Sequence, residues 1–325
     1  MKSKFVQDLS EGESIEECFA VKSKNSPRPY KEKPGLWFSL TVSDKTDYIP
    51  VKFWGGAVSD TVTQLFSSFN VGDVLLIKGS VEFDNFLKSL AISINEGVGQ
   101  ITKVDDYDSR DYIQSSKRNR EEMVTEFKEI VDSIQNSDIK RLLKDFFDDE
   151  EFMKKYSESP AASRHHHNCI SGLLEHVLNM IKISKIVVNN YPELDLDVLI
   201  AGCILHDIGK IAEYKTTTVI DYTVEGRMLG HIPIGYKMVE DKIVKLDQQT
   251  PFEKSTKYKI LNMVLSHHGV LEYGSPVLPR FPEAIALHKI DDCDAQVKLA
   301  LDVKDKIKSD DEIVWTREFE HMYMK

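Results

Sequence analysis

Histidine and aspartate side chains recur through the second half of this 325-residue sequence in an order that suits a metal site. The chain has ten histidines, and none of them precedes position 165. The candidate ligands are His176, His206, Asp207, His231, His267, His268 and Asp291. Asp207 follows an apolar stretch, where an unpaired buried carboxylate would cost several kcal/mol, so we expect a cation beside it. Mixed imidazole and carboxylate ligands favour Mn²⁺, Fe²⁺, Co²⁺ or Zn²⁺ over Ca²⁺.

Spacing alone leaves two of these assignments open. Asp292 and Asp294 stand beside Asp291, and any of the three could be the ligand. His267 and His268 are adjacent, and two neighbouring side chains rarely ligate equally well. We therefore expect one of the two to be the ligand and the other to be a supporting or substrate-binding group.

The first hundred residues contain the elements of a small β-domain. Apolar and β-branched runs separated by turn residues predict strands over 15–21, 36–42, 48–54, 74–83 and 87–94. The spacing of apolar residues predicts a helix over 58–69. Three strands, a helix and two strands in this order are typical of the five-stranded OB-fold barrel.

Helical periodicity dominates the rest of the chain after a polar, charged segment over 105–120 that is typical of a linker. The expected helices cover 121–134, 139–148, 169–188, 198–208, 234–244, 258–266 and 283–306, with a small β-excursion over 213–224. We therefore predict a multidomain protein: an all-β OB-fold-like barrel over 1–104, a linker over 105–120, and an all-α domain over 121–325.

Basic and aromatic residues gather in the N-terminal domain where OB-folds bind oligonucleotides. The segment 22–33 holds five basic residues and one acid, and its candidates for substrate contact are Lys24, Arg28, Tyr30, Lys31 and Lys33. The adjacent pairs Trp37-Phe38 and Phe53-Trp54 lie on the following strands, so at least one member of each pair must face outward. A solvated loop beside an aromatic core is the alternative interpretation.

Five short motifs give the chain a family resemblance: His166-His167, GLLEH over 172–176, HDIGK over 206–210, GHI over 230–232 and SHHG over 266–269. The ordered set resembles the HD-domain metal-dependent phosphohydrolases. Together with the OB-fold-like domain, it is similar to the YhaM-type 3′-5′ exoribonucleases over nearly the whole chain.

The resemblance implies two divalent transition-metal ions, with Mn²⁺ as the first choice. One ion would be held by His176, His206, Asp207 and Asp291, with Asp294 as the reserve for Asp291. Asp207 would bridge to a second ion held by His231 and His267, and a hydroxide between the two ions would be the nucleophile.

Further residues would support this chemistry. By resemblance, His166 and His167 lie near the site and contact substrate. Lys210 follows the His-Asp pair by one short turn, so it could neutralise a phosphate oxygen or complement the dipole at the end of a helix.

The resemblance implies a metal-dependent exonuclease that acts on single-stranded RNA or DNA and releases nucleoside 5′-monophosphates from the 3′ end. Two alternatives are a nucleotide or cyclic-nucleotide phosphohydrolase regulated by its N-terminal domain, and a nucleic-acid-binding adaptor with an inactive second domain. The longest apolar stretch, 198–205, is far too short to span a bilayer. Scattered cysteines and an N-terminus unlike a signal peptide predict a cytoplasmic protein, and a net charge of −11 argues against indiscriminate nucleic-acid binding.

Overall fold

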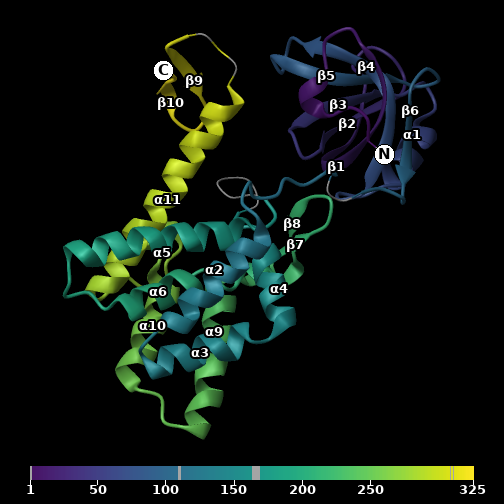
Figure 1. The fold of residues 1–325 in the computed structure, drawn as a ribbon. Coiled ribbons are helices and arrows are strands. Elements are labelled where there is room, and N and C mark those ends of the chain that lie inside the picture. Colours follow the sequence, from purple (N-terminus) through teal and green to yellow (C-terminus); the bar gives the residue numbers. More distant parts are fainter. Residues whose placement is uncertain (1, 109–110, 163–168, 308, 310) are drawn as a thin grey trace. The chain divides into compact units, whose positions relative to one another are not determined.

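The computed structural model of the chain describes residues 2–108, 111–162, 169–307, 309 and 311–325. It forms two compact units (Figure 1). Unit 1 contains Met1–Gln114 and Thr216–Ile220, and unit 2 contains Ser115–Lys215 and Asp221–Lys325. None of the described helices is long and apolar enough to cross a membrane.

Unit 1 is built on a six-stranded sheet with the strand order of an OB-fold. Its strands are β1 (Ser14–Pro29), β2 (Leu36–Ser43), β3 (Tyr48–Trp54), β4 (Val74–Asp84), β5 (Ser89–Asn95) and β6 (Gln100–Val104). Hydrogen-bonded pairs run from β1 through β2, β3, β5 and β4 back to β1, and only β3–β5 within this series is parallel. A short 3-10 helix, η1 (Val6–Asp8), precedes the sheet, and helix α1 (Ser59–Ser67) connects β3 to β4. The OB-fold-like prediction is confirmed.

Side chains that alternate along the strands form the core of unit 1 from one face of the sheet. On β2 and β3 the buried apolar positions are Phe38, Leu40, Val42, Ile49, Val51 and Phe53. Trp37 and Trp54 are only partly buried, as expected for neighbours that point to the opposite face. The outward placement of one aromatic residue in each adjacent pair is therefore confirmed.

In unit 1 one strand was not predicted, and one predicted strand boundary was wrong. The sequence prediction had no strand after residue 94, but β6 pairs with β4 through Val74–Val104 and Ile77–Ile101. This strand was missed because it is short and mostly polar. The first strand was expected to end at Val21, yet β1 continues to Pro29 because it pairs with β2 as far as Leu36.

Unit 2 is mainly helical, as predicted. Its helices are α2 (Arg120–Ser133), α3 (Ser137–Phe147), α4 (Glu150–Glu158), α5 (Gly172–Asn190), α6 (Leu196–Leu205), α7 (Lys210–Glu213), α8 (Val224–Leu229), α9 (His231–Gln249), α10 (Lys254–Ser266), the 3-10 helix η3 (Leu271–Tyr273) and α11 (Pro282–Lys306). The expected β-excursion is the strand pair β7 (Tyr214–Thr216) and β8 (Ile220–Tyr222). A second pair, β9 (Ile313–Thr316) and β10 (Glu320–Tyr323), was not predicted in this domain.

Helix α6 lies at the centre of unit 2 and sets the position of the His-Asp pair. Asp195 caps its N-terminus by accepting hydrogen bonds from the backbone amides of Asp197 and Val198. Every residue from Val198 to Leu205 is buried, which explains the apolar sequence on all sides of this helix. The helix packs against α5, α10 and α11, and each of those helices carries a candidate ligand on or just beyond it. The ligands therefore converge because their helices share one core.

Candidate metal centre

The candidate ligands lie in unit 2, most of them at helix ends. His206 caps the C-terminus of α6 and Asp207 follows it in the turn, while His231 is the first residue of α9. His267 caps the C-terminus of α10. The other ligands lie within helices: His176 on α5 and Asp291 on α11. These positions bring side chains from five separate segments into one site.

One group contains His176, His206 and Asp291, whose ligand atoms all lie within 4.8 Å of one another. The Nε2 atom of His176 is 3.2 Å from Asp291 Oδ1, and His206 Nε2 is 4.0 Å from the same oxygen. Asp207 Oδ2 approaches this group at 3.2 Å from His206 Nε2. The four residues predicted to hold one ion are therefore brought together.

A second group contains His231, His267 and His268, again with ligand atoms within 4.8 Å of one another. Asp207 Oδ1 faces this group, at 3.5 Å from His231 Nε2 and 3.6 Å from His267 Nε2. The two oxygens of one carboxylate thus face two different groups of imidazoles. This is the arrangement that a bridging ligand requires.

His268 lies within the second group, although the sequence analysis favoured His267 over it. Helix α10 ends at Ser266, so the two neighbouring imidazoles stand on a turning backbone with ring centroids 4.4 Å apart. The turn depends on Gly269, which has a φ of +80° and no room for a side chain, because a Cβ atom would lie 2.2 Å from His288 Nε2. His288 Nδ1 in turn donates to the carbonyl oxygen of His267 over 2.9 Å. His288 is a supporting residue that spacing did not identify.

Backbone carbonyl groups orient three of the imidazoles. The Nδ1 atoms of His206, His267 and His268 donate to the carbonyl oxygens of Cys203, Val264 and Tyr273, over 2.9, 2.9 and 2.8 Å. Because a carbonyl oxygen can only accept, each of these imidazoles holds its proton on Nδ1 when neutral. Each Nε2 atom therefore keeps a lone pair that is free to bind a cation.

Buried polar atoms without partners show that this cluster fits a metal. Among the described residues, His206 Nε2, Asp207 Oδ1, His231 Nε2 and His267 Nε2 are buried and have no partner with hydrogen-bond geometry. Leaving such atoms unpaired would cost about 1–3 kcal/mol each. Nitrogen and carboxylate donors of this kind suit a divalent transition metal.

The electrostatics of the site favour the protonation states that bind metal at Asp207 and His267. Burial alone would raise the pKa of Asp207, but Lys210 and His206 hold it well below its usual range. Burial, followed by the neighbouring His206, lowers the pKa of His267 well below its usual value. The carboxylate is therefore charged and this imidazole neutral at physiological pH.

Three further acidic residues differ in whether they contact a histidine of the site. Asp292 is exposed, so it is separated from the cluster. Asp294 lies at 2.7 Å from Nδ1 of His176, on the side of the ring away from Asp291. Glu213, which the sequence analysis did not single out, contacts Nδ1 of His231 at 3.2 Å. Only tertiary structure brings Glu213 to His231, and its sequence position gave no signal.

Three other predicted site residues are Lys210, His166 and His167. Lys210 begins α7, a helix of four residues, so it lies in the first and the last turn of that helix, and its Nζ atom lies 2.6 Å from Asp207 Oδ2. The phosphate contact and the cation at a helix C-terminus both stay predictions. His166 and His167 lie outside the described residues.

The basic and aromatic candidates of unit 1 separate into two classes. Lys24 is on β1, and its ammonium donates to the carbonyl oxygens of Phe66 and Phe69 at the end of α1. Burial lowers its pKa. Arg28, Lys31 and Lys33 are exposed. Lys24 is therefore engaged within the fold, whereas the other three are available to a ligand.

An aromatic stack lies beside the exposed basic residues. The rings of Tyr30 and Trp54 stack with centroids 6.2 Å apart, and those of Trp37 and Trp54 stack at 5.4 Å. Lys33 Nζ lies 4.3 Å from the centroid of Tyr30, whose hydroxyl donates to the carbonyl oxygen of Gly55. We call Tyr30, Trp37 and Trp54 the aromatic stack. All three are partly exposed and present π-faces next to positive charge.

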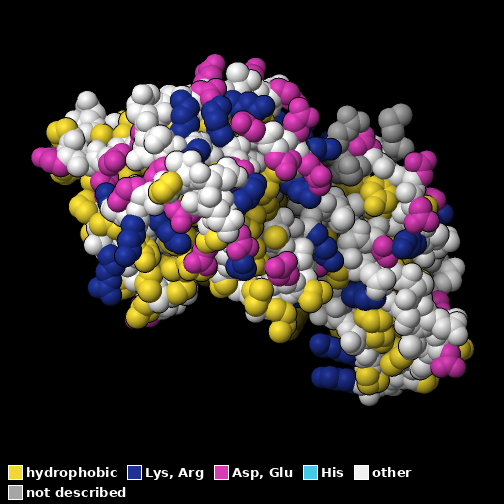
Figure 2. All heavy atoms as spheres, turned by 90° about the horizontal axis from the view of Figure 1, so that it is seen from below, with side chains coloured by type: hydrophobic (Ala, Val, Ile, Leu, Met, Phe, Trp, Pro, Cys, Tyr) yellow, Lys and Arg dark blue, Asp and Glu magenta, His cyan; other side chains and the backbone are white. Residues whose placement is uncertain are grey.

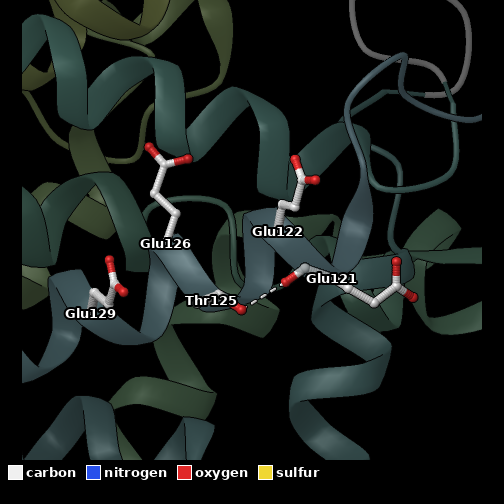
Figure 3. Close-up of a pocket in the computed structure, with 5 residues that line it drawn as sticks. All are labelled: Glu121, Glu122, Thr125, Glu126 and Glu129. Atoms are coloured by element: carbon white, nitrogen blue, oxygen red, sulfur yellow. Dashed lines mark hydrogen bonds between the residues drawn. The ribbon is translucent and has the colours of Figure 1, made fainter.

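A surface pocket lies on α2. It is lined by Glu121, Glu122, Thr125, Glu126 and Glu129, and the Thr125 hydroxyl donates to the carbonyl oxygen of Glu121 (Figure 3). Four carboxylates would repel a phosphate group. On the face shown in Figure 2, acidic and basic side chains are interspersed.

Comparison with known proteins places the chain among well-defined relatives. The sequence profile of the HD domain family matches residues 173–296. The 3′-5′ exoribonuclease YhaM of Listeria welshimeri is 32% identical over 296 residues, which cover 90% of this chain and 88% of the relative. YhaM of Geobacillus sp. is 32% identical, covering 91% of this chain and 87% of the relative, and YhaM of Bacillus subtilis is 30% identical, covering 91% and 90%.

The helical unit with its ordered histidines and aspartates is thus an HD domain, joined to an OB-fold-like domain. Identity of about this level over nine-tenths of the chain goes beyond the HD domain alone. The chain belongs to the YhaM family of 3′-5′ exoribonucleases. The family resemblance predicted from the sequence motifs is confirmed.

Proposed function

We propose that this protein is a metal-dependent 3′-5′ exoribonuclease that shortens single-stranded RNA and releases nucleoside 5′-monophosphates. The observation that carries the proposal is the position of Asp207, whose two oxygens face two separate groups of imidazoles. The names of the curated relatives support the reaction and its direction. The HD domain supports hydrolysis of a phosphate ester.

The proposed ligands divide between two ions. His176, His206 and Asp291 would hold one ion, and His231, His267 and His268 would hold the other, with Asp207 shared between them. Two divalent ions held in this way would lower the pKa of a shared water and offset the charge of the phosphodiester. A set of imidazoles and carboxylates suits several divalent transition metals, and among them we propose Mn²⁺ as the first to test.

Lys210 is proposed to act on the substrate phosphate. Its side chain is mostly buried, and its ammonium lies beside the carboxylate shared by the two groups. An ammonium at this position would stabilise negative charge that develops on a phosphoryl oxygen.

The N-terminal domain is proposed to hold the RNA strand. The aromatic stack offers sequence-tolerant stacking to bases, and Arg28, Lys31 and Lys33 offer contacts to phosphates. Lys24 is left out of this surface because its ammonium is bound to α1. In this division, 1–104 is the nucleic-acid-binding domain, 105–120 the linker and 121–325 the HD domain.

The decisive experiment follows the products of labelled single-stranded oligoribonucleotides. RNA labelled at its 5′ end should shorten stepwise in the presence of Mn²⁺, and RNA labelled at its 3′ end should release labelled mononucleotide at once. A chelator should stop both reactions. Fragments from a circular RNA would contradict an exonuclease, and hydrolysis of free nucleotides alone would favour a nucleotide phosphohydrolase.

A further inference from the structure

The imidazoles of the two groups differ in the partner of their Nδ1 atom. In His206, His267 and His268 this partner is a backbone carbonyl oxygen, as described above. In His176 and His231 it is a carboxylate oxygen, of Asp294 and of Glu213 respectively. Each of the two groups therefore contains one imidazole oriented by a buried acid.

Asp294 lies on the same face of α11 as the proposed ligand Asp291. It lies three residues after Asp291 on α11, so both side chains point toward α5. Asp291 Oδ1 lies 3.2 Å from Nε2 of His176, and Asp294 Oδ2 lies 2.7 Å from Nδ1 of the same ring. Asp294 is only 8% exposed. Helix α11 thus contacts both nitrogen atoms of one imidazole.

Glu213 holds the start of α9 in a corresponding way. Its Oε1 atom accepts a hydrogen bond from the backbone amide of His231 over 3.0 Å and lies 3.2 Å from Nδ1 of that residue. Glu213 is 5% exposed. Its backbone is packed against Gly226, where a Cβ atom would lie 2.3 Å from the Glu213 carbonyl oxygen. The backbone that carries this carboxylate is therefore closely packed.

A carboxylate affects a metal ligand more strongly than a carbonyl group does. It fixes the tautomer and the ring orientation, and its charge makes the inner nitrogen a better donor to a cation. Loss of such a partner typically lowers metal affinity about 10–100-fold. Since Asp294 and Glu213 act on different groups, the two effects should be separable.

We propose that Asp294 and Glu213 are positioning residues that each control the retention of one of the two metal ions. Asp294 acts through His176 on the first group, and Glu213 acts through His231 on the second. The inference rests on the proposed function only in its use of two ions. If the inference holds, either ion can be weakened without the other by changing a residue that is not itself a metal ligand.

The test is a Mn²⁺ titration of the full-length, chelator-treated protein without RNA, with free Mn²⁺ measured by electron paramagnetic resonance. The wild type should bind two ions per chain. Asp294→Asn and Glu213→Gln should each weaken one class of ion about 10–100-fold and leave the other within about twofold. Glu283→Gln is the matched control, because Glu283 is a buried carboxylate on the same helix as Asp294 that accepts a hydrogen bond from the backbone amide of Asp195, the N-cap of α6.

Double variants assign each effect to its group. In a His176→Ala background, Asp294→Asn should cause no further loss, whereas Glu213→Gln should weaken binding of the remaining ion about 10–100-fold. The reverse should hold in a His231→Ala background. Circular dichroism and thermal unfolding of each metal-free variant identify any that fail to fold, and Asp294→Glu and Glu213→Asp should then restore part of the affinity.

The outcomes separate this inference from the proposed function. Wild-type protein that binds fewer than two ions, or variants that weaken both ions equally or neither, would overturn the inference. Selective loss of one ion in each variant would support it even if the protein failed to degrade RNA, and that failure would count against the proposed function alone.

Discussion

Lys210 reaches Asp207 across a single turn and places its Nζ atom 2.6 Å from Oδ2 of the carboxylate. The Lys210 side chain is 12% exposed and the Asp207 side chain 4% exposed, so this ion pair is largely removed from water. The same carboxylate turns its other oxygen to His231 and His267. One acidic side chain therefore lies at the meeting point of two imidazole groups and a cation.

Asp207→Asn should remove metal binding and hydrolysis together. The amide keeps the size of the side chain but loses the charge that both groups share. We expect bound Mn²⁺ to fall from two ions toward none and hydrolysis of a small activated phosphodiester to fall to background. Metal analysis after chelation and reloading measures the first effect. Near-normal turnover in the reloaded variant would contradict the shared-ligand assignment.

Lys210→Met should separate catalysis from metal binding. The methionine side chain fills a similar volume, and the charge near the phosphate is lost. Metal content should be retained, while kcat for RNA falls about 10²–10³-fold, as when a preorganised electrostatic contact is removed. Lys242→Met is a control, because Lys242 forms its ion pair with Asp145 away from the site. A kcat within about threefold of the wild type would assign Lys210 a structural role.

The metal-free protein should lose stability as the pH rises. Burial alone would lower the pKa of His176, but its hydrogen bonds to Asp291 and Asp294 raise it to about 9 from an ordinary value of 6.5. A group with a raised pKa in the folded chain stabilises that chain below its unfolded pKa, and this contribution is lost as the pH rises through the folded value. Urea unfolding of chelator-treated protein should show a falling free energy of unfolding between about pH 6.5 and about pH 9.

The comparison for this pH effect is His176→Gln, which lacks the titrating imidazole. Its metal-free form should show a smaller decrease over the same range. An equal decrease in both proteins would assign the pH dependence to other groups.

The sequence predicted the candidate metal ligands better than the residues that contact those ligands. His176, His206 and Asp291 could be found because each has a ligand chemistry and because their order along the chain matches a family motif. Asp294 could be identified only as an alternative ligand to Asp291, and Glu213 was not identified, because contacts with distant histidines leave no mark in the spacing of the sequence. Their roles depend on how α7 meets α9 and how α11 meets α5.

The same limit applies to Lys24. Counting charges in the segment 22–33 treats all its basic residues as equivalent, whereas the fold brings the end of α1, more than forty residues away, against Lys24 alone. The strand order was predictable because turn residues and alternating apolar residues are local signals. Adjacent aromatic pairs were informative because alternation fixes which member faces outward, as Trp37 and Phe38 show.

Removal of one ring from the aromatic stack should weaken RNA binding without affecting the metal site. Trp37→Ala and Trp54→Ala should each cost about 1–3 kcal/mol of binding free energy for each base that is no longer stacked. Tyr48→Ala is the matched control, because Tyr48 is an exposed aromatic residue at the other end of β3. Fluorescence anisotropy with a labelled oligoribonucleotide and calcium in place of Mn²⁺ measures binding. Equal losses in all three variants would place the bases elsewhere.

The exposed basic residues of unit 1 should set the salt dependence of RNA binding. If Arg28, Lys31 and Lys33 contact phosphates, log K should fall with log[salt] at a slope of about −0.7 per contact, or about −2 for three. The triple change of these residues to Glu should flatten that slope and weaken binding to unrelated sequences alike, because phosphate contacts carry no base information.

Lys24→Met provides the contrast for this last prediction, because Lys24 donates to carbonyl oxygens at the end of α1 and has no free charge to offer. Its loss should lower the thermal stability of the N-terminal domain and leave the salt slope of the folded protein unchanged. Hydrolysis of a small activated phosphodiester, which needs only the HD domain, should stay near the wild-type rate in both proteins. An unchanged slope in the triple variant would show that Arg28, Lys31 and Lys33 do not bind the RNA. A flattened slope in Lys24→Met would show that Lys24 also contacts phosphate.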